Sequence, residues 1–97
     1  MIFESRRNPA HNFASGQLLC TPHTLEEVSA DEIQQALKRH LSGDWGDCEP
    51  EDAAANDLAV TEGTRLFSVY HSSSGTKFWI ITEADRSATT VLLPDDY

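Results

Sequence analysis

The sequence predicts a single α+β domain in which two to three helices pack on one face of a small antiparallel sheet of three or four strands. Three observations lead to it. The chain has 97 residues, enough for one modest core and no second domain. Apolar residues recur at helical spacing up to about residue 63, and from Arg65 onward the pattern changes to that of strands. We expect an irregular arm over 1–16, a mainly helical acidic half over 17–63 and a β-meander over 64–97.

The first regular elements are short. QLLC, residues 17–20, is predicted to be a strand that ends before Thr21 and Pro22. Proline suits the first position of a helix, where its missing N–H is not needed, and threonine caps such a start. A helix of one to two turns is therefore expected over 22–28.

The clearest helix signal begins at Ser29. Ser29 and Glu32 have the S-x-x-E spacing in which the two side chains satisfy each other's free amides at a helix start. Apolar residues and one histidine then form a stripe with helical spacing: Ile33, Ala36, Leu37, His40 and Leu41. Gly43 is the expected end because glycine takes the left-handed turn without a Cβ clash.

A further helix is predicted from Pro50 to a stop at Gly63, with Glu51 and Asp52 in its first turn, where carboxylates favour the helix dipole. Its apolar face is weak. We expect this face to consist of Ala54, Leu58, Val60 and neighbouring alanines.

The C-terminal third predicts a three-stranded meander. RLFSVYH and TKFWIITE flank the turn SSSG, and ATTVLLP follows the polar segment ADRS. FWII, residues 78–81, is apolar on both faces, so this strand should be central and covered on both sides. Helices would cover one side, and either the N-terminal arm or a second copy of the chain would cover the other. A homodimer is thus one expected state.

The net charge of −9 is confined to the middle of the chain. Between Glu26 and Glu62 lie eleven acidic and two basic residues, and the rest of the chain carries five of each. Such a segment cannot neutralise phosphates, so direct binding of nucleic acid is not expected. No signal peptide or membrane-spanning run is present, and two cysteines are compatible with reduced thiols, so we expect a soluble cytoplasmic protein.

One acidic stretch stands out as a candidate partner-binding site. SGDWGDCEPED, residues 42–52, places Trp45 among five carboxylates. Either Trp45 is a peg that pins a loop to the core, or it is an exposed anchor that meets a basic partner. In the second interpretation the binding residues are Asp44, Trp45, Asp47, Glu49, Glu51 and Asp52.

A second cluster offers a catalytic alternative, made of His71, Glu83, Asp85 and Arg86. Pairing around SSSG would put His71 and Glu83 at opposite ends of the hairpin, which argues against a shared metal. In TEADRS, residues 82–87, the acidic side chains are also typical turn formers. Cys20 and His23 have zinc-like spacing, but His40 and Cys48 are too far apart to complete the pattern. We expect no metal and no cofactor.

Three stretches resemble a family of small, largely uncharacterised proteins of bacterial plasmids and integrated elements. They are SGDWGDCEPEDAAAND, RLFSVYHSSSGTKFWI and WIITEADRSATTVLLPDDY, and the match runs from about Leu18 to Tyr97. The family sometimes has labels that imply a restriction or modification subunit, but this chain has no cofactor motif for methyl transfer. The resemblance implies no catalytic residues. It implies a mobile-element setting, in which small acidic proteins often block host defences.

Two functional hypotheses follow. The first is a non-catalytic interaction protein whose acidic face docks on a basic nucleic-acid-handling protein, as an anti-defence inhibitor would. The second is a small hydrolase or nuclease-like enzyme that uses Glu83, Asp85, Arg86 and His71.

Overall fold

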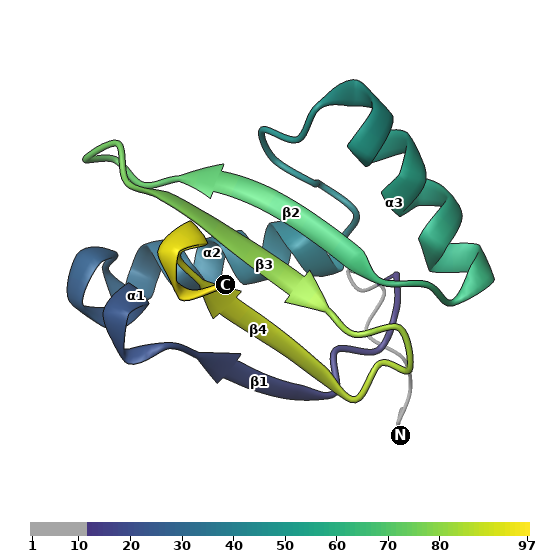
Figure 1. The fold of residues 1–97 in the computed structure, drawn as a ribbon, viewed down its shortest axis with the longest axis horizontal. Coiled ribbons are helices and arrows are strands. Elements are labelled where there is room, and N and C mark those ends of the chain that lie inside the picture. The colour runs from purple at the N-terminus through teal and green to yellow at the C-terminus, as the bar shows by residue number, and fades with distance from the viewer. Residues whose placement is uncertain (1–11) are drawn as a thin grey trace, which may run out of the picture.

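The computed structural model describes residues 12–97 and has an α+β fold, as the sequence predicts. Figure 1 shows the arrangement of its elements. The helices and strands are β1 (Gln17–Cys20), α1 (Pro22–Glu27), α2 (Ala30–Leu41), α3 (Pro50–Glu62), β2 (Leu66–His71), β3 (Lys77–Thr82), β4 (Ala88–Leu92) and the 3₁₀ turn η1 (Pro94–Asp96). Residues 12–16 precede β1 without regular structure, and the rest of the predicted arm lies outside the described residues.

The four-stranded sheet is mixed, with the order β1-β4-β3-β2. β2, β3 and β4 form the predicted antiparallel meander. β1 pairs in parallel with β4, from Gln17 beside Ala88 to Cys20 beside Val91, so the prediction of a purely antiparallel sheet was wrong. The hairpin signals in the sequence predict only the pairing of strands that follow each other directly along the chain. β1 is separated from β4 by all three helices and two strands, and a long connection of this kind permits parallel pairing.

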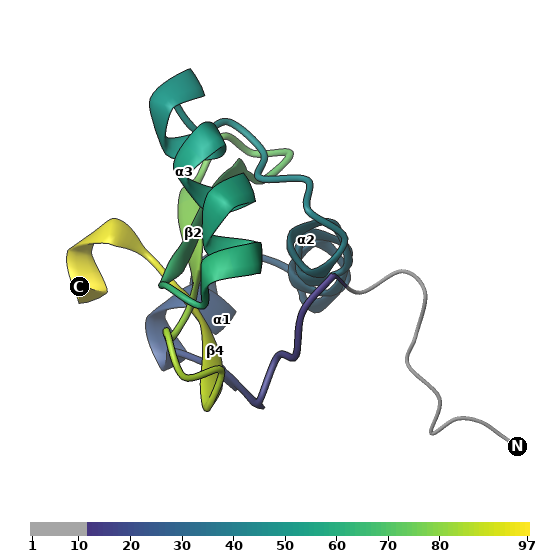
Figure 2. The same cartoon turned by 90° about the vertical axis from the view of Figure 1, so that its right-hand side faces the viewer.

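Helix α2 covers one face of the sheet, and Figure 2 shows it on the side opposite to the C-terminal turn. Its residues Ile33 and Ala36 pack against the side chains of one face of the meander. The buried core of this face consists of Val28, Ile33, Ala36, Tyr70, Phe78, Ile80, Val91 and Leu93. In β2 and β3 the alternate residues Phe67, Trp79 and Ile81 point to the other face, where Figure 2 shows the C-terminal turn η1.

Helix α3 lies along the β2 edge of the sheet (Figure 1). Its buried residues are Asn56 and Ala59, and Ala59 joins Trp45 and Leu66 in a second apolar cluster. The predicted apolar face is confirmed for Val60 and the neighbouring Ala53 and Ala59, which pack in this cluster, and was wrong for Ala54 and Leu58, which are exposed. Alanines occur on several sides of this helix, so its sequence pattern does not define which side is buried.

The helix ends agree with the sequence in most details. Ser29 caps α2 through its hydroxyl, which accepts a hydrogen bond from the Glu32 amide (3.3 Å). The Glu32 carboxylate does not return to the cap, because it accepts hydrogen bonds from the amide and the hydroxyl of Ser73, both at 2.8 Å. This carboxylate thus ties α2 to the β2–β3 turn. Gly63 ends α3 in the left-handed conformation, with φ of 75°.

Among residues 12–97, no helix has both the length and the apolar character needed to cross a membrane.

Candidate functional site

Trp45 is a peg between α2 and α3. Its side chain is 6% exposed and packs beside the rings of Phe13 and His40. The indole N–H donates a hydrogen bond to Asp57 of α3 (2.8 Å), so the polar atom of the buried ring is satisfied. The peg interpretation is confirmed, and the interpretation of Trp45 as an exposed partner anchor was wrong.

Two carboxylates beside Trp45 are bound to neighbouring side chains. Arg39 donates to both carboxylate oxygens of Asp44, at 2.7 and 3.2 Å, and this hydrogen-bonded pair holds the pKa of Asp44 below its ordinary value. Asp47 pairs with Nδ1 of His71 at 2.7 Å. Within the described residues, the GDWGD segment therefore works as a clasp that joins the end of α2 to β2, and Arg39 compensates the charge of Asp44.

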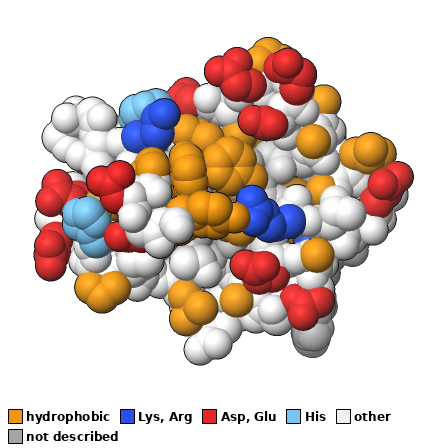
Figure 3. Space-filling model, in the orientation of Figure 1, with side chains coloured by type: hydrophobic (Ala, Val, Ile, Leu, Met, Phe, Trp, Pro, Cys, Tyr) orange, Lys and Arg blue, Asp and Glu red, His pale blue; other side chains and the backbone are white. Residues whose placement is uncertain are grey.

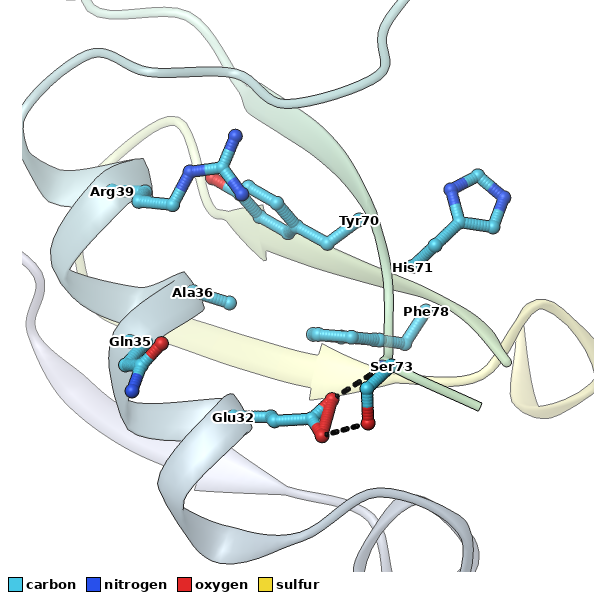
Figure 4. Close-up of a pocket in the computed structure, with 8 residues that line it drawn as sticks. All are labelled: Glu32, Gln35, Ala36, Arg39, Tyr70, His71, Ser73 and Phe78. Carbon is cyan, nitrogen blue, oxygen red and sulfur yellow. Dashed lines mark hydrogen bonds between the residues drawn. The ribbon is translucent and has the colours of Figure 1, made fainter. Parts of the chain in front are cut away.

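This clasp borders a groove of about 320 Å³ between α2 and β2 (Figure 4). At one end Glu32 holds Ser73, and at the other the Arg39 guanidinium lies 4.9 Å from the centre of the Tyr70 ring. Burial raises the pKa of Tyr70, so its hydroxyl stays protonated and donates to the carbonyl of Asp44 (2.7 Å). Arg39 is ion-paired with Asp44, and both carboxylate oxygens of Glu32 accept hydrogen bonds from Ser73, so the charged groups of this groove already have hydrogen-bond partners.

The structure does not bring together the four residues of the catalytic alternative. His71 pairs with Lys77 at one end of the β2–β3 hairpin, and Glu83 follows Thr82 at the other. The Arg86 guanidinium donates to four main-chain carbonyls, those of Thr64 (2.7 Å), Ala59 (2.9 Å), Glu83 (3.2 Å) and Ala84 (3.3 Å). Arg86 thus joins the end of α3 to the turn before β4.

Asp85 has a local role in the same turn. Its carboxylate accepts a hydrogen bond from the Ser87 amide (2.9 Å), and bonding to Ser87 lowers the pKa of Asp85. This is the turn-forming interaction that the sequence favours.

His40, the one histidine of the stripe on α2, is fully buried. Its Nδ1 lies 2.6 Å from the Ser68 hydroxyl and its Nε2 2.9 Å from the Thr82 hydroxyl. Thr82 continues the chain to Thr89 at 2.7 Å. Burial, with a smaller contribution from the charge of Arg86, lowers the pKa of His40 to about 4. The imidazole is therefore neutral near pH 7 and serves as a polar link between α2 and the sheet.

The two cysteines are free and half-buried, and burial raises the pKa of both thiols. Residues 12–97 contain no group of three or more histidine, cysteine or carboxylate side chains that could hold a metal ion.

A second groove, of about 370 Å³, lies on the open face of the sheet. Phe67 of β2 and Trp79 of β3 meet edge to face, with ring centres 5.0 Å apart, and Tyr97 meets Trp79 in the same way at 5.8 Å. Arg65 holds Tyr97 in place by donating to its hydroxyl (2.7 Å). Figure 3 shows hydrophobic side chains gathered at the centre of this face, with both basic and acidic side chains around them. We call Phe67, Trp79, Ile81 and Tyr97 the aromatic face.

The first turn of α3 contributes Asp52 to the same groove. Glu49 and Glu51 precede it and are exposed, and the Glu49 side chain makes no capping hydrogen bond. Among residues 12–97, these three carboxylates have no ion-pair partner, whereas Asp44 pairs with Arg39. The sequence placed them in the candidate site but did not place the aromatic face beside them. The available signal was the alternation of Phe67, Trp79 and Ile81 on one face of two paired strands.

No family model matches the chain, and no curated protein or solved structure is significantly similar to it.

Proposed function

We propose that the protein is a non-catalytic acidic interaction protein that docks on a partner with a basic surface. The docking surface is the aromatic face together with Glu49, Glu51 and Asp52 at the start of α3. One observation carries this proposal: Asp52 lines the same groove as Phe67, Trp79 and Tyr97. Trp79 here takes the role of partner anchor, which one of the two sequence interpretations gave to Trp45.

The chemistry of this surface fits a partner in two ways. Aromatic side chains are typical hot spots of interfaces, because they bury a large area with little loss of conformational entropy. Unpaired carboxylates at the margin attract a basic surface, and the net charge of −9 speeds the encounter through its long-range field. Together they favour a partner that has an apolar centre within a basic surround.

The partner that we propose is a nucleic-acid-handling protein, such as a host defence enzyme. The carboxylates of α3 would occupy the positions that phosphates otherwise take on its basic surface. The setting in a mobile genetic element rests on the resemblance of the GDWGD segment and the C-terminal tail, and the cytoplasm is the compartment in which such an inhibitor would act.

The catalytic alternative is not proposed. The guanidinium of Arg86 is engaged by main-chain carbonyls, and His71 lies at the far end of the hairpin from Glu83. No observation favours a substrate site at this turn.

The proposal is tested by affinity capture from the organism that carries the gene, with captured proteins identified by mass spectrometry. Two charge-matched triple variants are compared. Glu49→Gln/Glu51→Gln/Asp52→Asn alters the docking surface, and Glu26→Gln/Glu27→Gln/Asp31→Asn alters exposed acids on α1 and α2. A basic protein should be retained by the wild type and the second variant and lost from the first and from Trp79→Ala. Equal retention by all variants, or equal loss from both triple variants, would contradict the proposal.

A further inference from the structure

The two edge strands of the sheet, β2 and β1, differ in whether their outward main-chain groups have hydrogen-bond partners. At the β2 edge, the Asn56 amide group pairs with the main chain of Phe67: Phe67 N donates to Oδ1 (3.0 Å) and Nδ2 donates to Phe67 O (2.6 Å). Val69 N donates to Trp45 O (3.2 Å), and Asp47 N donates to Val69 O (2.7 Å). The outward main-chain groups of Phe67 and Val69 are therefore occupied, and another strand cannot add there.

The β1 edge is open within the described residues. Gln17 N donates to Ser87 O and Thr21 N to Val91 O, both at 3.0 Å, so these residues turn their main-chain groups toward β4. Main-chain direction alternates along a strand, and the N–H and C=O groups of Leu18 and Cys20 consequently point outward. Leu18 is 53% exposed and Leu19 42% exposed. Figure 1 shows β1 as the outermost strand, with no labelled element beyond it.

We propose that a second copy of the chain pairs with this edge, antiparallel, about a two-fold axis at Leu19. Leu19 then faces the partner's Leu19, and Leu18 lies opposite the partner's Cys20. This register uses all four outward groups of each strand, because Leu18 and Cys20 exchange N–H and C=O bonds with the partner's Cys20 and Leu18. The two four-stranded sheets become one continuous sheet.

The chemistry of β1 favours a second copy as the occupant. QLLC carries no charge, although the whole chain has a net charge of −9, so the two edges meet without opposed like charges. Natural edge strands are usually kept very short or are blocked by lysine, proline or a bulge. β1 is short, with four residues, but has no lysine, proline or bulge between Gln17 and Cys20. The same molecule blocks its other edge with side-chain and loop hydrogen bonds. Leu18 and Leu19 supply the apolar area that the pairing buries.

The pairing should be weak and dependent on salt. A four-residue edge buries less area than a standard interface, and the charges elsewhere on the two copies repel. Salt shortens the range of this electrostatic repulsion, so association should strengthen as the ionic strength rises from about 0.05 M to about 0.5 M. The axis lies normal to the sheet, and both aromatic faces would therefore be presented on the same side. The inference does not depend on the proposed function.

The test is the molar mass of the full chain, measured by light scattering between about 10 μM and about 1 mM. The mass should rise toward that of a dimer with concentration and with salt. Leu19→Lys should keep the protein monomeric, because it places two ammonium groups at the axis. Leu25→Lys is the matched control on α1, where the leucine is 59% exposed, and should associate like the wild type.

A cross-link separates this dimer from other dimers. In a Cys20→Ala/Cys48→Ala background, Leu19→Cys should oxidise to a disulfide dimer at least tenfold faster than Leu25→Cys, because residues directly opposite in an antiparallel pair bring their Cβ atoms within disulfide reach. The proposal is overturned by a monomeric mass at every concentration, by equal effects of Leu19→Lys and Leu25→Lys, or by equal cross-linking rates. It is also overturned if Trp79→Ala abolishes association and Leu19→Lys does not.

Discussion

The side chain of Asn56 takes the place of a neighbouring strand beside Phe67. Its amide group both donates to and accepts from the main chain of Phe67, at 2.6 and 3.0 Å, from a buried position on α3. One polar residue on a weakly apolar helix thus fixes how α3 meets β2. The Cys48 thiol also approaches the same carbonyl, at 3.2 Å.

Asn56→Ala should lower the free energy of unfolding by about 2 kcal/mol, because two hydrogen bonds to half-buried main chain are lost. Alanine raises helix propensity by only about half a kcal/mol, which does not offset this loss. Urea unfolding measures the difference. Gln34→Ala, at an exposed position of α2, is the control and should leave stability nearly unchanged. Equal stabilities of the two variants would show that Asn56 does not hold α3 on the sheet.

Gly46→Ala should be much more destabilising than Gly63→Ala, although the two glycines have similar φ values of 73° and 75°. A Cβ at Gly46 would overlap the carbonyl oxygen of Val69 and lie 2.7 Å from the Tyr70 ring, whereas a Cβ at Gly63 meets nothing within 4 Å. Gly63→Ala should cost about 1 kcal/mol, the ordinary cost of the left-handed conformation. Gly46→Ala should cost at least about 3 kcal/mol, as overpacking does. Thermal and urea unfolding of both variants provide the comparison, and similar losses would refute the close contact of this loop with β2.

Stability should fall as the pH decreases from about 6.5 to about 4. The pKa of His40 is about 4 in the folded protein, compared with an ordinary value of 6.5, so the unfolded chain binds a proton first. The contribution of the neutral His40 to stability is complete above its pKa in the unfolded chain, and it decreases as the pH falls through this window. Its size is about 3 kcal/mol, from 1.36 kcal/mol for each pH unit.

Urea unfolding as a function of pH, with and without His40→Gln, isolates this contribution. The variant should lose the dependence between pH 6.5 and 4. His23→Gln should retain the dependence between pH 6.5 and 4. The pKa of His23 is raised by its hydrogen bond to Asp96, so His23 changes the stability only at pH values above about 6.5. The pKa values of Asp44, Asp85 and Asp96 are lowered, so protonation of these carboxylates reduces stability only at still lower pH. An unchanged slope in His40→Gln would contradict the neutral, buried imidazole.

The two tryptophans should differ in their access to solvent. Trp45→Phe leaves the half-buried Trp79 as the only indole, and Trp79→Phe leaves the buried Trp45. Acrylamide should quench the fluorescence of Trp45→Phe more strongly, and its emission maximum should lie at longer wavelength. The opposite order would place Trp45 on the surface and restore it as a partner anchor.

Most of the fold follows from local signals in the sequence. Thr21, Ser29 and Gly63 mark helix ends by the chemistry of caps, and the SSSG turn with its flanking strands defines the hairpin. The parallel pairing of β1 depends on which edge of the meander is free, and no residue in QLLC indicates which edge that is. The side of α3 that faces the sheet was not predicted either, because the residue that binds α3 to β2 is the polar Asn56 and not an apolar residue.

The candidate site was predictable in part. The carboxylates of Glu49, Glu51 and Asp52 follow from the charge pattern, but their neighbours depend on the path of the chain. Trp45 and Trp79 are equally apolar in the sequence. Only the pairing of Trp45 with Asp57 inside the fold, and the place of Trp79 on the uncovered side of the sheet, separate the peg from the exposed ring.

In the function that we propose, the aromatic face beside the start of α3 is the surface that meets a basic protein. Photo-cross-linking in the native host tests it most directly, with a benzophenone amino acid in place of Trp79 and, as the control, in place of the exposed Leu25 on α1. We predict that position 79 cross-links a basic, nucleic-acid-handling protein and that position 25 does not. Cross-linking of the same protein from position 25 and not from position 79 would contradict the account.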